Sequence, residues 1–338
     1  MTSFRLRIMA QVLPFLLIAP GIALAQAPPT RGEAAAAVNH ATNRAMPQYT
    51  RQQIDQLVAP IALYPDQLLT QVLMAATYPQ QIAEAAQWLQ QAGHANLKSE
   101  ALAAALEPLP WEPSVKALVA FPGVIAMLSE HIEWTQALGV AFATQQADVM
   151  MRVQSLRHLA YRSGKLRTFR HLAVREEGSV IIITSAEPDR IFVPVYNPTV
   201  VYGAWPYPAY PPVFIPPPPN FVAETLTPGI EVSVGYGIVA PLWGWSRPDW
   251  RDRRITINRN EYSRITNNVE LAPGNFWQHR GPVVLAAPVT EQRNVRQNVQ
   301  APHGTVAPAA AAAVVNLPQR AAAQPTQIRT PSAAERTG

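Results

Sequence analysis

Apolar residues recur at helical spacing in the first half of the chain, between residues 50 and 165. Thr50 and Gln53 form a capping-box pair, which marks the start of a helix. Proline is favoured at the first position of a helix, where its missing N–H costs nothing. Tyr64-Pro65 and Tyr78-Pro79 are therefore each expected to end one helix and start the next. The pattern predicts an all-α domain of several short helices over residues 50–165, long enough to hold its own core.

After residue 165 the apolar period changes from that of a helix to that of a strand. Leu172–Arg175 and Val180–Thr184 flank a Glu-Glu-Gly-Ser turn and predict a β-hairpin. Ile191–Tyr196 predicts a third strand, which Pro194 confines to a sheet edge or a bulge because proline cannot donate to a ladder. Residues 166–203 are expected to form a small antiparallel β-sheet packed on the helical domain.

Prolines and aromatic residues dominate residues 204–220, which have the composition of a stiff polyproline arm. Residues 221–281 form a basic segment rich in Trp and Arg, in which Arg254–Asn260 alternates like a short strand. Residues 282–338 are rich in Ala, Pro and Gln and are expected to be disordered. The predicted fold class is α+β: an N-terminal all-α multi-helix domain followed by a small antiparallel β-sheet, with Pro-rich and disordered C-terminal regions.

The N-terminus predicts export. Residues 1–25 combine a positive start at Arg5 and Arg7, an apolar stretch and the small residues of Ala23-Leu24-Ala25, which are the parts of a cleavable signal peptide. The apolar stretch is shorter than the roughly 20 residues that cross a bilayer. Residues 26–49 show no sustained pattern and predict a flexible leader. The chain has no cysteine to accept a lipid anchor, so we expect a soluble or peripheral protein of the periplasm or envelope surface.

Composition and motifs narrow the possible chemistry. Removing Arg5 and Arg7 with the signal lowers the 27 basic residues to 25, against 22 acidic ones. This excess is too mild to indicate nucleic acid, which is not an expected partner. The absence of cysteine excludes thiolate chemistry, and the seven histidines show no paired metal-ligand spacing. No nucleophile or phosphate-loop motif occurs, so the sequence predicts no catalytic residue, no cofactor and no metal site.

Two candidate binding surfaces remain. Aromatic side chains on a pre-ordered polyproline spine lose little entropy on binding, which makes the arm a possible partner-binding site through Trp205, Tyr207, Tyr210 and Phe214. Residues 149–175 carry no acid and form a possible polyanion-binding site through Arg152, Arg157, Arg162, Lys165, Arg167 and Arg170. The spacing of these cations does not line one helix face, so a solvated exterior is the other interpretation. The aromatic rings, in the same way, could pack back onto the sheet or the helices.

Several long motifs occur in an order that resembles a known family. They include Leu57–Asp66, Trp111-Glu112-Pro113-Ser114-Val115-Lys116 and Val193-Pro194-Val195-Tyr196-Asn197-Pro198. The chain is similar over roughly Arg51 to Pro219 to exported proteobacterial proteins that carry the domain of unknown function 3300. The resemblance is looser over Trp243–Arg280 and weakest over Phe221–Trp243. It implies a compartment and a continuous fold, but no activity, substrate or catalytic residue.

Three functional hypotheses follow. The sequence favours a non-enzymatic interaction or structural protein of the periplasm or cell envelope, whose partner is an envelope protein or a cell-wall component. The first alternative is a cell-wall polymer hydrolase, which requires carboxylates such as Asp66, Glu112 and Asp148 to converge in one cleft. The second alternative is a peripheral protein that contacts anionic lipid or another polyanion weakly through its arginines.

Overall fold

The computed structural model describes residues 48–217, 223–227, 229–233, 236–266 and 274–283. These residues all belong to one compact unit, Met1–Arg293; a second unit, Asn294–Gly338, lies outside the described residues. The expected signal peptide and most of the leader and of the tail also fall outside them. The described part contains ten α-helices, α2–α11, and nine strands, β1–β9, and the predicted α+β class is confirmed.

The helices are short and follow the prolines. Thr50 and Gln53 close the predicted capping box at the start of α2. Prolines occupy the first position of α4, α6 and α7, and Pro65 is the residue before α3. The helices are α2 (Arg51–Val58), α3 (Asp66–Ala75), α4 (Pro79–Gln90), α5 (Ser99–Leu106), α6 (Pro113–Leu118), α7 (Pro122–Glu130), α8 (Ile132–Thr144) and α9 (Gln146–Arg162).

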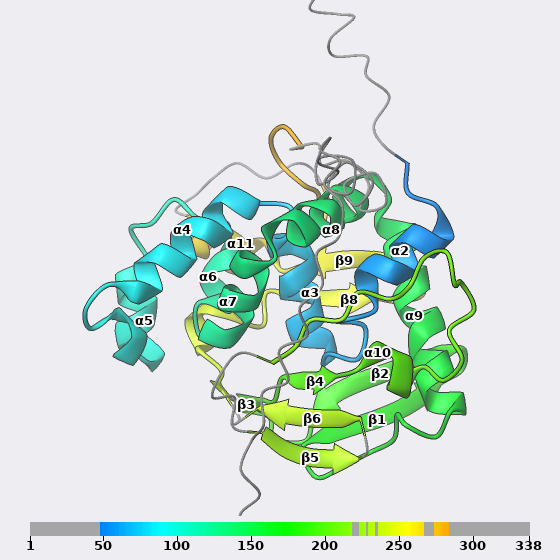
Figure 1. The fold of residues 1–338 in the computed structure, drawn as a ribbon. Helices are drawn as coiled ribbons and strands as arrows, with labels where there is room; N and C mark the ends of the chain where they lie inside the picture. Colours follow the sequence, from blue (N-terminus) through cyan, green and yellow to red (C-terminus); the bar gives the residue numbers. More distant parts are fainter. Residues whose placement is uncertain (1–47, 218–222, 228, 234–235, 267–273, 284–338) are drawn as a thin grey trace, which may run out of the picture. The chain divides into compact units, whose positions relative to one another are not determined.

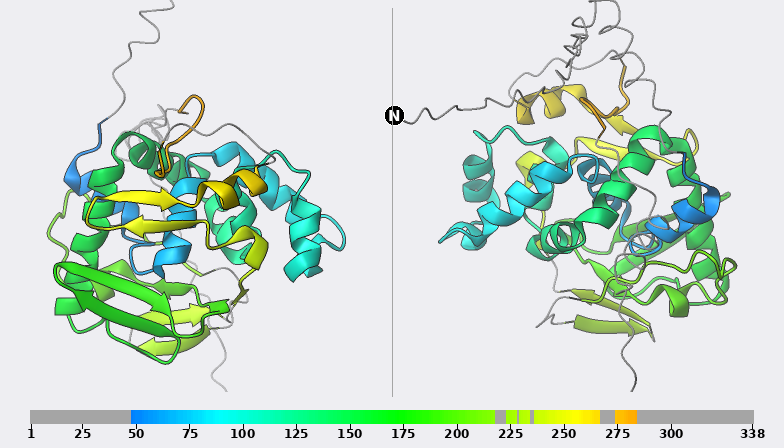
Figure 2. Two further views of the ribbon diagram at one scale, coloured as in Figure 1. Left: turned by 180° about the vertical axis from the view of Figure 1, so that it is seen from behind. Right: turned by 45° about the horizontal axis from the view of Figure 1, so that its top comes forward.

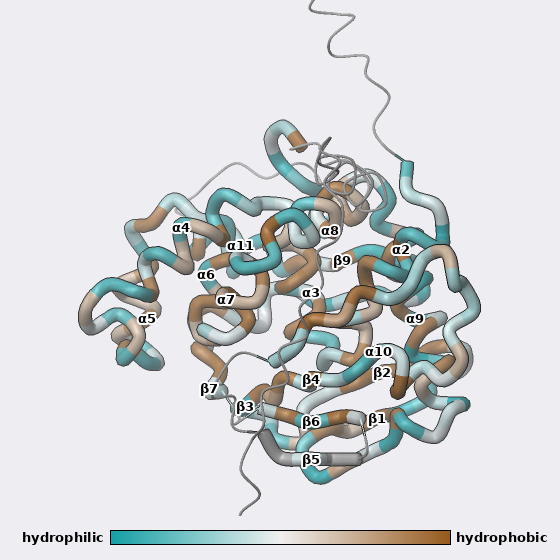
Figure 3. Tube along the Cα trace, in the orientation of Figure 1, coloured by the Kyte–Doolittle hydropathy of each residue, from teal (hydrophilic) through white to brown (hydrophobic). Residues whose placement is uncertain are grey.

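Helix α3 is the centre of the helical part. All of its residues except Gln67 are buried, and it packs against α6, α8, β8 and β2. Hydrophilic positions recur along α4, which lies further out (Figure 3). Helix α8 crosses the end of α3 so closely that a Cβ atom on Gly139 would lie 2.0 Å from the carbonyl oxygen of Ala76. A glycine is therefore required at this crossing.

The predicted hairpin is confirmed as β1 (Leu172–Glu177) and β2 (Val180–Ser185), paired from Leu172↔Ser185 to Glu177↔Val180. The predicted third strand is divided into β3 (Arg190–Ile191) and β4 (Pro194–Tyr196), and neither pairs with the hairpin. Strand β4 forms one edge of the order β4-β6-β5, as Pro194 predicted, with β5 at Ala223–Thr227 and β6 at Ile230–Ser233. Strand β3 pairs with β7 (Tyr236–Gly237). The predicted single sheet is thus several small sheets completed by residues beyond position 203.

The segment 221–281 is part of the core. Strands β8 (Ser246–Asp249) and β9 (Arg254–Ile257) form a hairpin, and β8 lies against α3 (Figures 1 and 2). The short strand expected over Arg254–Asn260 ends at Ile257 because Asn258 caps a helix, α11 (Arg259–Ile265), by accepting from two backbone N–H groups. Trp245, Tyr262 and Trp277 are buried in the same core as the N-terminal helices. The boundary expected near residue 165 therefore does not separate two compact bodies.

One buried arginine of α9 contacts the segment before α3, the start of α3, strand β2 and the β8–β9 turn. Arg157 of α9 has no exposed surface. Its guanidinium donates to the carbonyl oxygens of Ala62 (2.8 Å), Tyr64 (3.0 Å) and Ile181 (2.8 Å). It also donates to Oδ1 of Asp66 at 2.6 Å. The indole of Trp250, beside the β8–β9 turn, donates to Oδ2 of Asp66 (2.8 Å) and lies 4.8 Å from the guanidinium carbon.

Replacing Arg157 with Met should lower the free energy of unfolding by about 3–5 kcal/mol, because it leaves the Asp66 carboxylate buried without its cation. Arg162→Met on the same helix is the matched control. Arg162 is exposed, and a surface change of this kind should stay within about 0.5 kcal/mol. Urea denaturation of both variants measures the difference, and equal stabilities would show that the buried pair does not hold the fold.

Gly139→Ala should destabilise the protein by about 3 kcal/mol, the upper part of the range for overpacking, because the added methyl meets backbone that cannot rotate away. Gly123→Ala in α7 is the control, since its Cβ would meet only the Tyr236 hydroxyl at 3.7 Å. Thermal unfolding should separate the two variants clearly. Wild-type stability in Gly139→Ala would mean that α8 and α3 cross at a greater distance.

Candidate functional site

The aromatic residues of the arm form a packed cluster. The backbone N–H of Tyr210 donates to the carbonyl of Tyr207 at 2.9 Å, and the indole N–H of Trp205 donates to the carbonyl of Tyr210 at 2.8 Å. The rings of Trp205 and Tyr207 meet edge to face at 6.3 Å, and Tyr202 lies 6.0 Å from Trp205. Residues 207–210 therefore form a turn, which differs from the expected polyproline spacing. All three predicted rings, Trp205, Tyr207 and Tyr210, are partly exposed.

The arm is hydrogen-bonded to helix α2 at Pro211 and Val213, and the two segments run close together (Figure 1). The side chain of Gln56 donates to the carbonyl of Pro211 at 2.7 Å, and the N–H of Val213 donates to the carbonyl of Gln56. Ile215 is buried, whereas the preceding Phe214 is 48 % exposed. The backbone thus presents Phe214 to solvent from an ordered segment. Residues 218–220, the expected end of the arm, lie outside the described residues.

Part of the predicted basic site lies beside this cluster. Arg152 makes a bidentate pair with Asp55, with both N···O distances 2.6 Å, and also hydrogen-bonds the Tyr207 side chain. The Ser163 hydroxyl at the end of α9 donates to the carbonyl of Val201 in α10 (Pro198–Val201), just before the arm. We call this region the arm–α9 surface. It consists of Tyr161, Arg162, Lys165, Val200, Trp205, Tyr207, Tyr210 and Phe214.

The other predicted cations divide between surface and core. Arg162, Arg167 and Arg170 are exposed, and Lys165 is partly exposed. Arg167 lies over the ring of Phe169, 5.8 Å from its centroid. The expectation of a polyanion contact is wrong for Arg157, because all of its contacts described above are buried. Sequence spacing could not distinguish the buried Arg157 from the exposed basic residues near it, because the aspartate that neutralises it lies far away in the sequence.

The three carboxylates of the hydrolase hypothesis have separate partners. Asp66 binds Arg157 and Trp250. Glu112 is buried and accepts hydrogen bonds from other side chains, described below. Asp148 accepts only a 3.3 Å contact from Gln145 among the described side chains. Among the described residues, none binds two of these three acids at once. The arrangement therefore gives the hydrolase hypothesis no support.

A buried polar cluster surrounds Glu112, just before α6. Its carboxylate accepts from the Tyr262 hydroxyl (2.6 Å), the Trp277 indole (3.2 Å) and the Arg280 guanidinium (3.0 Å). The backbone N–H of Arg280 donates to the Tyr78 hydroxyl at 3.1 Å. Burial, followed by the nearby charge of Glu112, raises the pKa of Tyr78 to about 12. Sequence analysis missed this cluster because its members come from positions 78 to 280, with no local motif.

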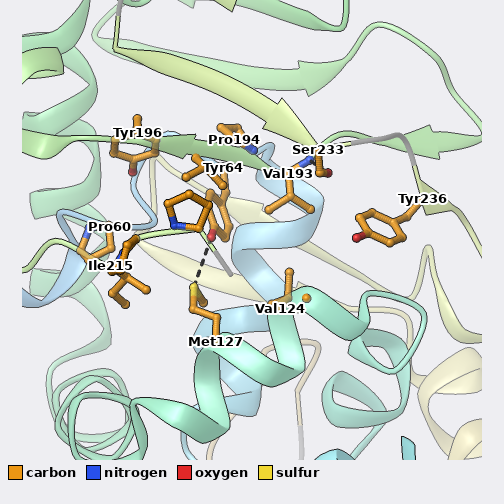
Figure 4. Close-up of a pocket in the computed structure, with 14 residues that line it drawn as sticks. Pro60, Tyr64, Val124, Met127, Val193, Pro194, Tyr196, Ile215, Ser233 and Tyr236 are labelled. Carbon is orange, nitrogen blue, oxygen red and sulfur yellow. Dashed lines mark hydrogen bonds between the residues drawn. The ribbon is translucent and has the colours of Figure 1, made fainter. Parts of the chain in front are cut away.

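An apolar pocket of about 80 Å³ lies between the Pro60–Tyr64 segment, α7, β4 and the end of the arm (Figure 4). Val124, Val193 and Ile215 line it, and the described lining includes no charged side chain. The Tyr64 hydroxyl donates to the thioether of Met127 at 3.5 Å, which is a weak acceptor. Burial raises the pKa of this tyrosine. The pocket can hold a small apolar group.

Two further properties bear on function. Within the described ranges, no helix has both the length and the apolar content that a membrane crossing requires. Over the same ranges, no three His, Asp or Glu side chains gather as a set of metal ligands.

The fold and these surfaces define an α+β protein with a helical centre and small antiparallel sheets. The chain belongs to the family described as "Protein of unknown function (DUF3300)", whose model matches residues 50–279, and the predicted family is confirmed. The "Uncharacterized protein YacH" of Escherichia coli strain K12 is 37 % identical over 270 residues, which cover 69 % of this chain and 43 % of the relative. The chain thus spans less than half the length of that relative. No solved structure matches.

Glu112→Gln should release residues 274–283 from the helical part, because a neutral amide cannot balance Arg280 and the cluster is left with a partly buried, unpaired cation. Hydrogen–deuterium exchange of this segment, whose Trp277 N–H donates to the carbonyl of Ile255 at 2.8 Å, should rise by tenfold or more. Glu84→Gln is the control, since Glu84 accepts only the Trp111 indole among the described residues. Unchanged exchange in Glu112→Gln would show that the segment is held by other contacts.

Proposed function

We propose that this protein is an exported, non-enzymatic interaction protein that binds an anionic component of the cell envelope through the arm–α9 surface. The proposal of export is supported by residues 1–25, whose charged start, apolar stretch and small residues have the order of a signal peptide. The proposal of a non-enzymatic role is supported by Asp66 and Glu112, whose carboxylates each bind their own partners inside the fold.

The observation that carries the binding proposal is the order of the aromatic arm. Hydrogen bonds from Trp205 to Tyr210 and from Gln56 to Pro211 fix rings that remain partly exposed. A partner that docks on rings already held in place pays little side-chain entropy. Aromatic residues are also enriched among those that dominate binding energy at interfaces.

The charge of the same surface defines the partner. Arg162 and Lys165 lie at the end of α9, beside the contact between Ser163 and Val201 that leads into the arm. Arginine is suited to carboxylate and phosphate groups, and charge complementarity increases both the rate and the specificity of association. A partner with acidic groups and an apolar or ring-shaped portion fits both features. Acidic cell-wall polymers and acidic segments of envelope proteins have this chemistry.

Capture from envelope fractions tests this function. The mature protein should retain a specific wall or protein component, and retention should fall at least tenfold in Phe214→Ser and in Lys165→Glu. Matched controls are Phe276→Ser, which alters another exposed phenylalanine, and Lys98→Glu, which makes the same charge change near α5. Both controls should retain the component as the wild type does.

Salt dependence separates the two contributions to binding. Retention through Lys165 should weaken steeply between low and molar salt, whereas the contribution of Phe214 should persist. Equal recovery by all five proteins would refute the arm–α9 surface as the binding site. Binding to anionic vesicles alone, lost in Lys165→Glu and unaffected by Phe214→Ser, would favour peripheral membrane contact.

A further inference from the structure

A second cavity, separate from the arm, lies against the Glu112 cluster. Its volume is about 520 Å³, which falls in the range of roughly 300–1,000 Å³ found for small-molecule sites. It is an open recess lined by α4, the loop Pro108–Trp111, α6 and the residues around Thr266 and Arg280. These segments are distant in sequence, so the cavity exists only in the folded protein.

Among the described residues, hydrogen-bond donors without an acceptor for every N–H or O–H line this cavity. Lys116 is 2 % exposed, and its ammonium donates to the carbonyl oxygens of Glu107 (3.1 Å) and Ile265 (3.2 Å). An ammonium has three N–H donors, so one remains. The Tyr78 oxygen accepts from the Arg280 backbone, and no acceptor among the described residues takes its hydroxyl proton. The side-chain N–H₂ of Gln81 likewise has no acceptor in the described part of the chain.

The acceptors of the cavity wall are already engaged. Glu112 accepts three side-chain hydrogen bonds through its two carboxylate oxygens. The Gln81 side-chain oxygen accepts the backbone N–H of Glu112 at 2.7 Å. The wall carries two cations, of which Arg280 pairs with Glu112 and Lys116 lies near the charge of Glu107. The unused hydrogen-bonding capacity is therefore that of donors.

We propose that this cavity binds a small carboxylate-bearing molecule, with the carboxylate received by Lys116 and Tyr78. Charged hydrogen bonds of this kind are the strong ones, and Gln81 supplies a further donor for a neighbouring carbonyl or hydroxyl oxygen. Leu109, Pro110 and Trp111 give the ligand an apolar wall. Peptide-like and sugar acids share this chemistry. The site is independent of the arm–α9 surface, so either proposal can fail without the other.

The lysines provide a direct readout. The chain contains only Lys98, Lys116 and Lys165, so lysine-labelled protein gives three resolvable side-chain signals by NMR. Burial lowers the pKa of the Lys116 ammonium, which the nearby Glu107 partly opposes. A bound carboxylate favours the charged form of a lysine and should raise this pKa. Addition of N-acetylalanine or of glucuronate should therefore shift the Lys116 signal with saturation, while Lys98 and Lys165 stay unchanged.

Two variants and one neutral ligand complete the experiment. Tyr78→Phe removes one hydroxyl and should weaken binding about tenfold, the equivalent of one charged hydrogen bond. Tyr236→Phe, which alters the wall of the apolar pocket, is the matched control and should bind as the wild type. N-acetylalanine represents peptide-like acids and glucuronate represents sugar acids. The acid that saturates the Lys116 shift at the lower concentration identifies the class of ligand.

Three outcomes would overturn the proposal. They are no shift of Lys116 with either acid at 50 mM, equal shifts of all three lysines, and equal binding of neutral glucose. Unaltered affinity in a folded Tyr78→Phe variant would also remove Tyr78 from the site and contradict the proposed geometry.

Discussion

The buried pair between Arg157 and Asp66 is the interaction on which the arrangement of the unit depends. A charge with no solvent exposure is tolerated only when its hydrogen-bonding groups find partners. Arg157 meets this requirement by drawing on the segment before α3, on strand β2 and on Asp66, which Trp250 also binds. The β1–β2 hairpin, the central helix and the β8–β9 hairpin are therefore fixed relative to α9 by one guanidinium.

Glu112 has a comparable role at the start of α6. Both acids stand where a short helix begins, and both are bound by side chains from the C-terminal third of the described chain. In each case the helical part and the following segments share one core because a buried carboxylate requires donors that its own helix does not contain. Asp66 and Glu112, two of the three carboxylates that the hydrolase hypothesis requires, are thus engaged in structural contacts.

The two proposed binding regions differ in physical character. The arm–α9 surface is open, aromatic and basic, and suits a large partner that covers it. The cavity beside Glu112 is a recess with unused donors, and suits a small acid. Both regions depend on segments that an ion pair holds in place. Helix α9 carries Arg157, which binds Asp66, together with Arg162 of the arm–α9 surface, and Arg280 lines the cavity while it binds Glu112. Loss of either pair would therefore disturb recognition as well as stability.

The sequence by itself determined the elements whose causes are local. Thr50 with Gln53, the helix-starting prolines and the turn before Val180 each act within a few residues, so the short helices and the β1–β2 hairpin could be predicted. Only the tertiary structure decided which strands pair with β3 and β4, and that Arg157 is buried while Arg162 is exposed. It also decided that Tyr78, Glu112 and Arg280 lie together. Burial and long-range pairing depend on residues between 24 and 202 positions apart, and no local period carries that information.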